Sequence, residues 1–371
     1  MSQTPQILDA ALLETPLATQ FMHAGGTPEL TVYRGVRTAL RFSSTAQELQ
    51  SLLQTAGIFD RGYRARLRAT GKDRVRWLNG MITQAVKSMS PGQVGYTLVL
   101  NPQGRIQGDG DVLAWDDHLL LQTDRFQTER LLGHLRRFII MDDVRLEELD
   151  AAATALGIAG PETAAILEKL GGSMPEPDTF RTGQLAGIDV TLVRAWSPVV
   201  PRVEIWVAAE RVAELWRALA AAGATPCGSE ATEQLRILEG TPQFDVDFSD
   251  KHLPQEVNLP RALNFTKGCY IGQEIVERIR ARATVHRSLR QFELQGEMPA
   301  PGPEGKIELR AGETAVGELT SVAQVELPEL KKTLALGVAR VEALDKSGTE
   351  ALRYEGGIAV PLDAPPVPAA S

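Results

Sequence analysis

A short segment in the last third of the chain combines several reactive side chains. Residues 264–276 read Asn-Phe-Thr-Lys-Gly-Cys-Tyr-Ile-Gly-Gln-Glu-Ile-Val. Lys267 lies two positions before Cys269, and the glycines at 268 and 272 permit backbone torsions and close approaches that a side chain would prevent. A buried packing segment needs neither the cation nor the thiol. We therefore interpret residues 267–274, hereafter the KGCYIGQE motif, as part of a ligand site.

Cys269 allows three interpretations, and the sequence leaves them open. It could be a nucleophilic or redox thiol, activated by the cation of Lys267 and nearby arginines. It could contact a ligand or a cluster-bearing partner without reacting, or it could be a small packing residue. The motif contains no histidine to act as a base, so a Cys-His catalytic pair is not expected. The other cysteine, Cys227, is expected to be structural.

The KGCYIGQE motif resembles the signature K-G-C-Y-x-G-Q-E of the YgfZ family. These folate-binding proteins are related to the glycine cleavage T-protein, which is an aminomethyltransferase. The resemblance spans about residues 45 to 345, with further similar segments in the expected order at residues 56–60, 67–74, 235–240, 316–321 and 335–339. It implies a multi-domain, T-protein-like α+β fold, with ferredoxin-like domains around a central opening and a small C-terminal β-barrel.

The resemblance also implies a function. Members of the family are accessory proteins that bind tetrahydrofolate or a one-carbon derivative of it. They support iron-sulfur cluster assembly or repair, including iron-sulfur enzymes that modify tRNA, and Cys269 would carry any thiol role. The folate-binding residues that it implies are Lys267, Gly268, Cys269, Tyr270, Gly272, Gln273 and Glu204, to which the positive charge that follows the motif adds Arg278.

Glu204 is included because residues 202–206, Arg-Val-Glu-Ile-Trp, resemble a strand of the T-protein. In that family a carboxylate on this strand hydrogen-bonds the pterin ring of folate. The family's glycine before the glutamate is replaced here by Val203. The alternative interpretation is a glutamate on a surface strand.

Asp109 bears on whether the chain is an enzyme. In aminomethyltransferases an N-x-x-G turn leads to an aspartate near the folate nitrogen that carries the one-carbon unit. Counted from the turn at residues 101–104, that place falls on Gly108, and backbone alternation predicts Asp109 on the opposite face of the strand. A bulge at Gly108 or Gly110 would restore it. We therefore expect an aminomethyltransferase-like fold without glycine cleavage activity, keeping Asp109 as the fallback catalytic residue and true aminomethyl transfer as the alternative.

Positive charge is concentrated around the motif. Residues 264–290 hold six Lys or Arg and two Glu, in a chain whose net charge is −8. On an extended segment Arg278, Arg280 and Arg282 would share one face. Such a face could bind a polyglutamate tail or the phosphates of tRNA, or it could simply be solvated. The overall acidity and an aromatic content of 5% count against a dedicated tRNA-binding module.

Composition limits the remaining possibilities. The 371 residues, 43% hydrophobic and 23% charged, predict a soluble chain of two or three domains, which we expect to be a monomer. Two cysteines, no secretory signal and no long apolar run favour the cytoplasm and no membrane association. Five scattered histidines predict no metal site. A calcium-loop pattern at residues 245–256 has Asp250 where the loop needs glycine.

Local patterns divide the chain into five parts. Residues 1–28 are a loose segment, 29–150 and 151–283 are two α+β folate-binding regions, 284–363 are the barrel, and 364–371 are a tail. Thr45 and Glu48 predict a capping box at a helix start. The alanine-rich residues 150–160 predict a further helix, and short strands punctuated by Pro and Gly follow residue 290.

Overall fold

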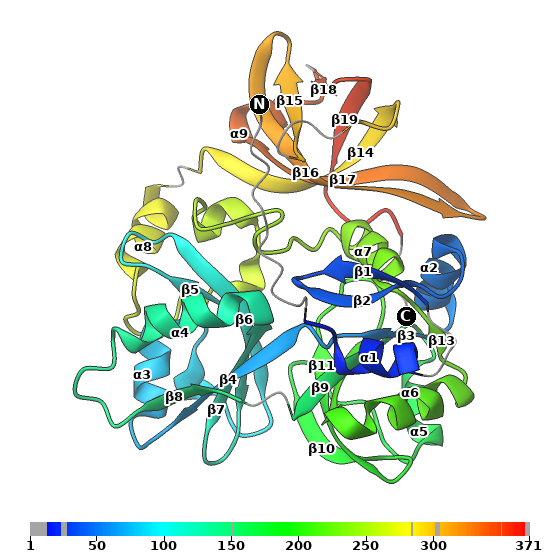
Figure 1. The fold of residues 1–371 in the computed structure, drawn as a ribbon. Coiled ribbons are helices and arrows are strands. Elements are labelled where there is room, and N and C mark those ends of the chain that lie inside the picture. Colours follow the sequence, from blue (N-terminus) through cyan, green and yellow to red (C-terminus); the bar gives the residue numbers. More distant parts are fainter. Residues whose placement is uncertain are drawn as a thin grey trace, which may run out of the picture.

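The computed structural model describes residues 13–23, 28–149, 152–282, 285–300, 305–349 and 351–367. Two β-sheets with their helices lie side by side, and a closed β-barrel lies across one end of both (Figure 1). The predicted α+β class with a C-terminal barrel is confirmed. No helix in these residues is long and apolar enough to cross a membrane, and they contain no cluster of three or more His, Cys, Asp or Glu able to hold a metal.

The first sheet has five antiparallel strands in the order β5-β6-β7-β4-β8. Its apolar face packs on two helices through residues such as Leu67, Leu121 and Leu131. Its elements are β4 (Arg64–Thr70), α3 (Arg74–Met81), η1 (Val86–Ser88), β5 (Val94–Leu100), β6 (Ile106–Ala114), β7 (Leu119–Asp124), η2 (Arg125–Gln127), α4 (Thr128–Arg136) and β8 (Arg145–Glu148).

The second sheet has six strands in the order β10-β11-β12-β9-β3-β13. Strand β3 comes early in the chain yet pairs antiparallel with β9, so the chain passes from this sheet into the first sheet and back again. This crossing is not part of the predicted division at residue 150. The elements are α1 (Pro16–His23), β3 (Gly57–Asp60), β9 (Ala153–Ala159), α5 (Thr163–Lys169), β10 (Phe180–Leu185), β11 (Ile188–Ala195), β12 (Arg202–Ala208), η3 (Ala209–Arg211), α6 (Val212–Ala221) and β13 (Thr225–Pro226).

The helix predicted for residues 150–160 is wrong, because residues 153–159 form strand β9. This strand pairs with β12 on one side and β3 on the other, and residues 154–159 are all buried. A strand covered on both faces needs small or apolar side chains throughout, which an alanine-rich run supplies. Pairing with two distant strands therefore overrides the local helix propensity.

The N-terminal hairpin consists of β1 (Glu29–Tyr33) and β2 (Val36–Arg41). Arg34 and Gly35 form its two-residue turn with φ of 52° and 81°, the left-handed pair typical of a type I′ turn. The hairpin packs against α7 (Ser229–Leu238), which also contacts α2 (Thr45–Gln54) and the barrel strand β16 (Thr314–Leu327). The hairpin thus lies beside the junction between the second sheet and the barrel.

Helix α2 begins at Thr45 as predicted, but its cap differs from the predicted capping box. Ser44 is the N-cap and accepts a hydrogen bond from the Gln47 backbone N–H. Glu48 is fully buried and accepts from the backbone N–H groups of Phe42 and Gly228, at 2.6 and 2.7 Å. Its carboxylate therefore joins α2 to the start of α7.

The barrel closes in the order β14-β17-β16-β15-β18-β19 around an apolar centre. It is tied to the rest of the chain through Asp247, whose buried carboxylate accepts from Arg236 of α7 and from Ser321 of β16, both at 2.6 Å. The remaining elements are η4 (Pro254–Val257), η5 (Pro260–Ala262), α8 (Gln273–Arg282), β14 (Arg287–Gly296), β15 (Ile307–Ala311), β16 (Thr314–Leu327), β17 (Leu330–Arg340), α9 (Val341–Asp345), β18 (Leu352–Tyr354) and β19 (Gly357–Leu362).

Candidate functional site

A cavity of about 170 Å³ lies between the two sheets, where α7 and η5 close its sides. Strands of both sheets contribute charged side chains to its wall, among them Asp109 of β6, Asp124 of β7 and Glu204 of β12. We call it the central cavity. It brings together two of the predicted site residues, Glu204 and Asp109, which are far apart in the sequence.

Glu204 is buried, and both of its carboxylate oxygens have neighbouring donors. Trp206 Nε1 donates to its Oε1 at 2.8 Å, Gln122 Nε2 donates to the same oxygen, and Arg61 Nε lies 2.8 Å from Oε2. Burial works to raise the pKa of Glu204, but Arg61 and Arg64 outweigh it and the pKa is lowered. The side chain is therefore an ionised acceptor inside the protein, and the surface-strand alternative is wrong.

A chain of alternating charges continues from Glu204 through the cavity wall. Arg64 lies 4.0 Å from Glu204 and forms ion pairs with Asp111 at 3.0 Å and Asp124 at 2.9 Å, and Asp124 pairs in turn with Arg34. Burial raises the pKa of Asp124, yet Arg34 and Arg64 reverse this and lower it. Burial raises the pKa of Asp111 despite Arg64 and Arg261.

Asp109 faces the central cavity, so its predicted position on the opposite face of the strand is wrong. The pairing of β5 with β6 shifts between Val99 and Leu100, which leaves Gln107 as an extra, bulged residue. Tyr96 donates to Asp109 Oδ2 at 2.7 Å, and Gln127 donates to Oδ1 at 2.9 Å. A bulge therefore turns Asp109 toward the cavity, as was considered for Gly108 or Gly110, but the bulged residue is Gln107.

Gly108 occupies its position for a steric reason. A Cβ atom there would meet Gln127 Oε1 at 2.7 Å and Leu131 Cδ2 at 2.8 Å. An aspartate at 108 would require these two side chains to move. The chain therefore places its cavity carboxylate at 109 and leaves 108 without a side chain.

The KGCYIGQE motif contacts the first sheet through Lys267. Its Nζ donates to the backbone carbonyls of Asn79, Ile82 and Gln84 at 2.7, 2.6 and 2.6 Å. Burial, helped by the charge of Lys87, lowers the pKa of Lys267 to about 7, so the charged and neutral forms are close in free energy near neutral pH. Only the ammonium form has three N–H donors for the three carbonyls.

The two glycines of the motif differ in how closely other atoms approach them. Gly272 has φ of 81°, and a Cβ there would meet the Asn101 carbonyl oxygen at 2.6 Å, so the predicted close approach is confirmed at this position. A Cβ at Gly268 would meet nothing within 4 Å, and the close approach predicted there is wrong. The motif therefore packs on the turn at residues 101–104 through Gly272.

The motif does not border the central cavity. None of residues 267–274 contributes to its wall, so the expectation that the thiol and Glu204 face one opening is wrong. Cys269 is exposed, which rules out its interpretation as a packing residue, while the other two interpretations stay open. Cys227 is buried, and burial raises its thiol pKa, in keeping with the expected structural role.

The arginines after the motif lie on helix α8, so the predicted extended segment with a shared face is wrong. Successive helical residues are rotated by about 100°, which places Arg278 and Arg282, four residues apart, on one side of the helix and Arg280 on the other. Arg278 pairs with Glu274 at 2.5 Å and Arg280 with Glu277 at 3.4 Å, all on an exposed surface. Arg278 lies outside the central cavity.

The arginines of the central cavity are not among the site residues predicted from the sequence. In the described part of the chain, eleven buried side-chain polar atoms have no hydrogen-bond partner, and five of them belong to cavity residues. They are Arg61 Nε, Arg64 Nε, Arg202 Nε, Thr241 Oγ1 and Arg261 Nε. The available signal was the close spacing of Arg61 and Arg64, just before and at the start of β4. A ligand that brings acceptor oxygens would satisfy these atoms.

Comparisons with known proteins agree with this architecture. The family model described as the GCVT N-terminal domain matches residues 15–267. An aminomethyltransferase of Thermosynechococcus vestitus is 28% identical over 332 residues, covering 88% of this chain and 87% of that protein. One of Geobacillus kaustophilus is 26% identical over 347 residues, covering 89% and 91%.

The structural comparison concerns the fold. The glycine cleavage system aminomethyltransferase T of Bartonella henselae superposes with a TM-score of 0.83 at 18% identity, covering 96% of this chain and 98% of that one. The predicted T-protein-like, multi-domain arrangement is thereby confirmed.

The three carbonyl contacts of Lys267 lead to a stability prediction. We expect Lys267→Met to lower the free energy of unfolding by about 2–4 kcal/mol, because part-buried carbonyls lose their donor. Urea denaturation measures the change. The matched control, Lys87→Met, removes a nearby exposed lysine and should cost less than about 0.5 kcal/mol. Equal losses in the two variants would show that Lys267 does not fix the motif to the first sheet.

Proposed function

The chain belongs to the aminomethyltransferase-like family defined by the GCVT N-terminal domain, and on that premise we propose that it binds tetrahydrofolate or a one-carbon derivative in the central cavity. One observation carries the proposal: the wall of the central cavity holds both an ionised carboxylate, Glu204, and five buried side-chain polar atoms that make no well-directed hydrogen bond. A reduced folate has ring N–H donors for such a carboxylate and carbonyl and carboxylate oxygens for the arginines. One ligand would thus supply both the donors for Glu204 and the acceptors for the arginines.

The pterin ring would bind at Glu204. Oxygen Oε1 already accepts from Trp206 and Gln122, whereas Oε2 has Arg61, whose Nε makes no well-directed hydrogen bond. The cavity volume of about 170 Å³ is below the roughly 300–1,000 Å³ that drug-sized ligands occupy. Movement of Arg61, whose side chain is 20% exposed, would free Oε2 and enlarge the cavity at the same place.

The carboxylate tail of folate would bind at the cavity mouth rather than at Arg278. Among the described residues, neither Arg194 nor Arg261 has a carboxylate within 4.0 Å, and both line the cavity. Arg261 lies between the rings of Tyr96 and Trp196, at 3.9 and 4.4 Å from their centroids. Trp196 is 45% exposed, so an aminobenzoyl ring has an aromatic surface to stack on.

Glu204→Gln tests the binding proposal. Losing the charge should weaken tetrahydrofolate binding about 10- to 100-fold, because hydrogen bonds to a charged group contribute roughly 1.5–3 kcal/mol. Isothermal calorimetry measures the affinity, and circular dichroism checks the fold. Glu214→Gln, the same change at an exposed glutamate of α6, should leave affinity unchanged, as should Arg278→Gln. If Glu204→Gln binds tetrahydrofolate with wild-type affinity, the pterin ring does not bind at Glu204.

Aminomethyl transfer is the second candidate function, favoured by the position of Asp109. Its carboxylate faces the cavity between Tyr96 and Gln127, where a group acting on bound folate would have to lie. The full-length relatives are aminomethyltransferases by name. In such a reaction the one-carbon unit leaves a lipoyl-bound aminomethyl group for tetrahydrofolate, and ammonia is released.

Asp109→Asn distinguishes catalysis from binding alone. If the chain is a transferase, folate-dependent ammonia release in a reconstituted glycine cleavage assay should fall at least about 100-fold in the variant. Tetrahydrofolate affinity should change less than about threefold, since Glu204 is intact. No release by the wild type would exclude this activity and leave a folate-binding accessory role.

The accessory role in iron-sulfur enzyme maintenance and tRNA modification rests on the KGCYIGQE motif. Cys269 is exposed on a segment that Lys267 and Gly272 hold against the first sheet, so a partner protein can reach the thiol. We expect Cys269→Ser to abolish complementation of an iron-sulfur enzyme defect without loss of stability or of folate binding. Full complementation by the variant would exclude the thiol from this role.

A further inference from the structure

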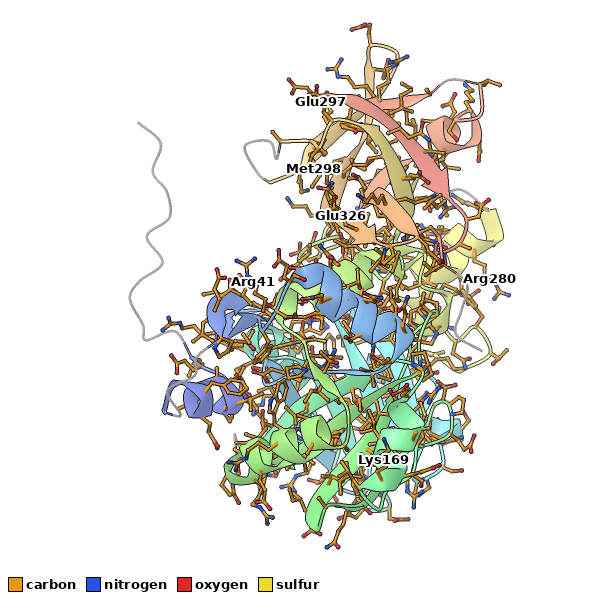
Figure 2. All side chains as sticks on the ribbon, turned by 90° about the vertical axis from the view of Figure 1, so that its right-hand side faces the viewer. Arg41, Lys169, Arg280, Glu297, Met298 and Glu326 are labelled. Atoms are coloured by element: carbon orange, nitrogen blue, oxygen red, sulfur yellow. The ribbon has the colours of Figure 1, made fainter. Side chains whose placement is uncertain are left out.

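A second opening lies on the surface between the N-terminal hairpin and the barrel. This hairpin–barrel groove encloses about 600 Å³ and is lined by parts of β1, α2, α7 and β16 together with Met298. Tyr33 is the one lining residue that it shares with the central cavity. In Figure 2, Met298 and Glu326 lie on the barrel side and Arg41 on the hairpin side, while Arg280 of α8 lies at the opposite edge of the molecule.

The groove runs along the free edge of strand β1. Thr31, Val32 and Tyr33 of β1 line it together with Leu40 of β2, and since consecutive residues of a strand point to opposite faces, part of the opening lies along the edge of β1. Tyr33 and Val36 flank the two-residue turn and form the first hydrogen-bonded pair, which directs the main-chain N–H and C=O of Val32 away from β2. Neither group has a main-chain partner in the described part of the chain.

The groove is acidic and partly apolar. Its lining includes Glu230, Glu233 and Glu326 but no lysine or arginine. Arg236 and the Tyr33 hydroxyl engage Glu233. Glu326 is exposed. Glu230, with a side chain 40% exposed, accepts from Thr45 Oγ1 at 2.7 Å and forms only a long ion pair, at 3.8 Å, with Arg41. Two carboxylates thus remain accessible to a cation from outside.

Two further features point to an occupant. Ser229 is one of the lining residues, and its buried Oγ has no hydrogen-bond partner among the described residues. Val32 and Met298 are 51% and 53% exposed on the groove wall, although both side chains are apolar. An occupant with alternating apolar and polar side chains would cover these surfaces and supply a partner for the hydroxyl.

From these features we propose that the hairpin–barrel groove binds an extended, basic segment of a partner protein, which adds to β1 as an antiparallel or parallel strand. Main-chain bonds to Val32 give the affinity of such strand addition, and side-chain contacts give its specificity. Lysine or arginine side chains of the segment pair with Glu230 and Glu326, and the apolar residues between them cover Val32 and Met298. The residues of this chain outside the described ranges contain no lysine or arginine, so the cations come from another molecule.

A defined peptide tests the proposal on the full-length protein. The probe is a fluorescein-labelled, end-blocked octapeptide in which lysine or arginine alternates with valine, and binding is followed by fluorescence anisotropy at low salt. We expect the double variant Glu230→Gln/Glu326→Gln to bind it about tenfold more weakly than the wild type. The control Glu308→Gln/Glu342→Gln makes the same charge change at exposed sites on β15 and α9 and should lose less than about twofold.

Two further probes separate this site from alternatives. The same peptide with N-methyl groups at alternate residues keeps its charge but cannot pair with a strand edge, and it should bind at least about tenfold more weakly. Saturating tetrahydrofolate should leave peptide binding unchanged, because the central cavity is separate. The proposal is overturned by equal binding of the methylated peptide, by equal losses in the two double variants, by displacement with folate, or by no binding at about 1 mM peptide.

Discussion

The alternating row of buried charges between the two sheets is the constraint on which the rest of the structure depends. It runs from Arg34 through Asp124 and Arg64 to Glu204 and Arg61, and it joins the N-terminal hairpin to strands of both sheets. Removal of one member would leave its neighbour charged and unpaired in a place where water cannot compensate. The row therefore fixes the relative position of the sheets, and the central cavity is the space that remains between them.

The same row determines what the cavity can accept. Arginine Nε atoms in it lack well-directed acceptors, whereas the carboxylates are already engaged by several donors each. An incoming ligand must therefore supply acceptors for the arginines and compete for Glu204 with its own donors. A neutral apolar molecule would satisfy neither requirement. This is the physical argument for a polar ligand that carries both hydrogen-bond acceptors and donors, and it does not depend on any single hydrogen bond.

The KGCYIGQE motif has a different role in the structure from the one its composition suggests. Its lysine is used to satisfy three carbonyls, and its second glycine allows a close approach to the turn before β6. These contacts leave Cys269 exposed on the outside of the first sheet, away from the cavity. The proposed ligand site and the exposed thiol therefore lie on separate surfaces of the molecule.

The sequence by itself determined the features that depend on local or periodic patterns: the α+β class, the barrel after residue 290, the start of α2 and the buried role of Cys227. The resemblance of residues 202–206 to a T-protein strand also located a cavity carboxylate, Glu204. Only the tertiary structure decided that residues 153–159 are a strand, because two distant partners outweigh alanine's helix propensity. It also decided the face on which Asp109 lies, since one bulged residue reverses the alternation, and it brought together Arg61, Arg64 and Arg261, whose shared site has no signature in the spacing of the chain.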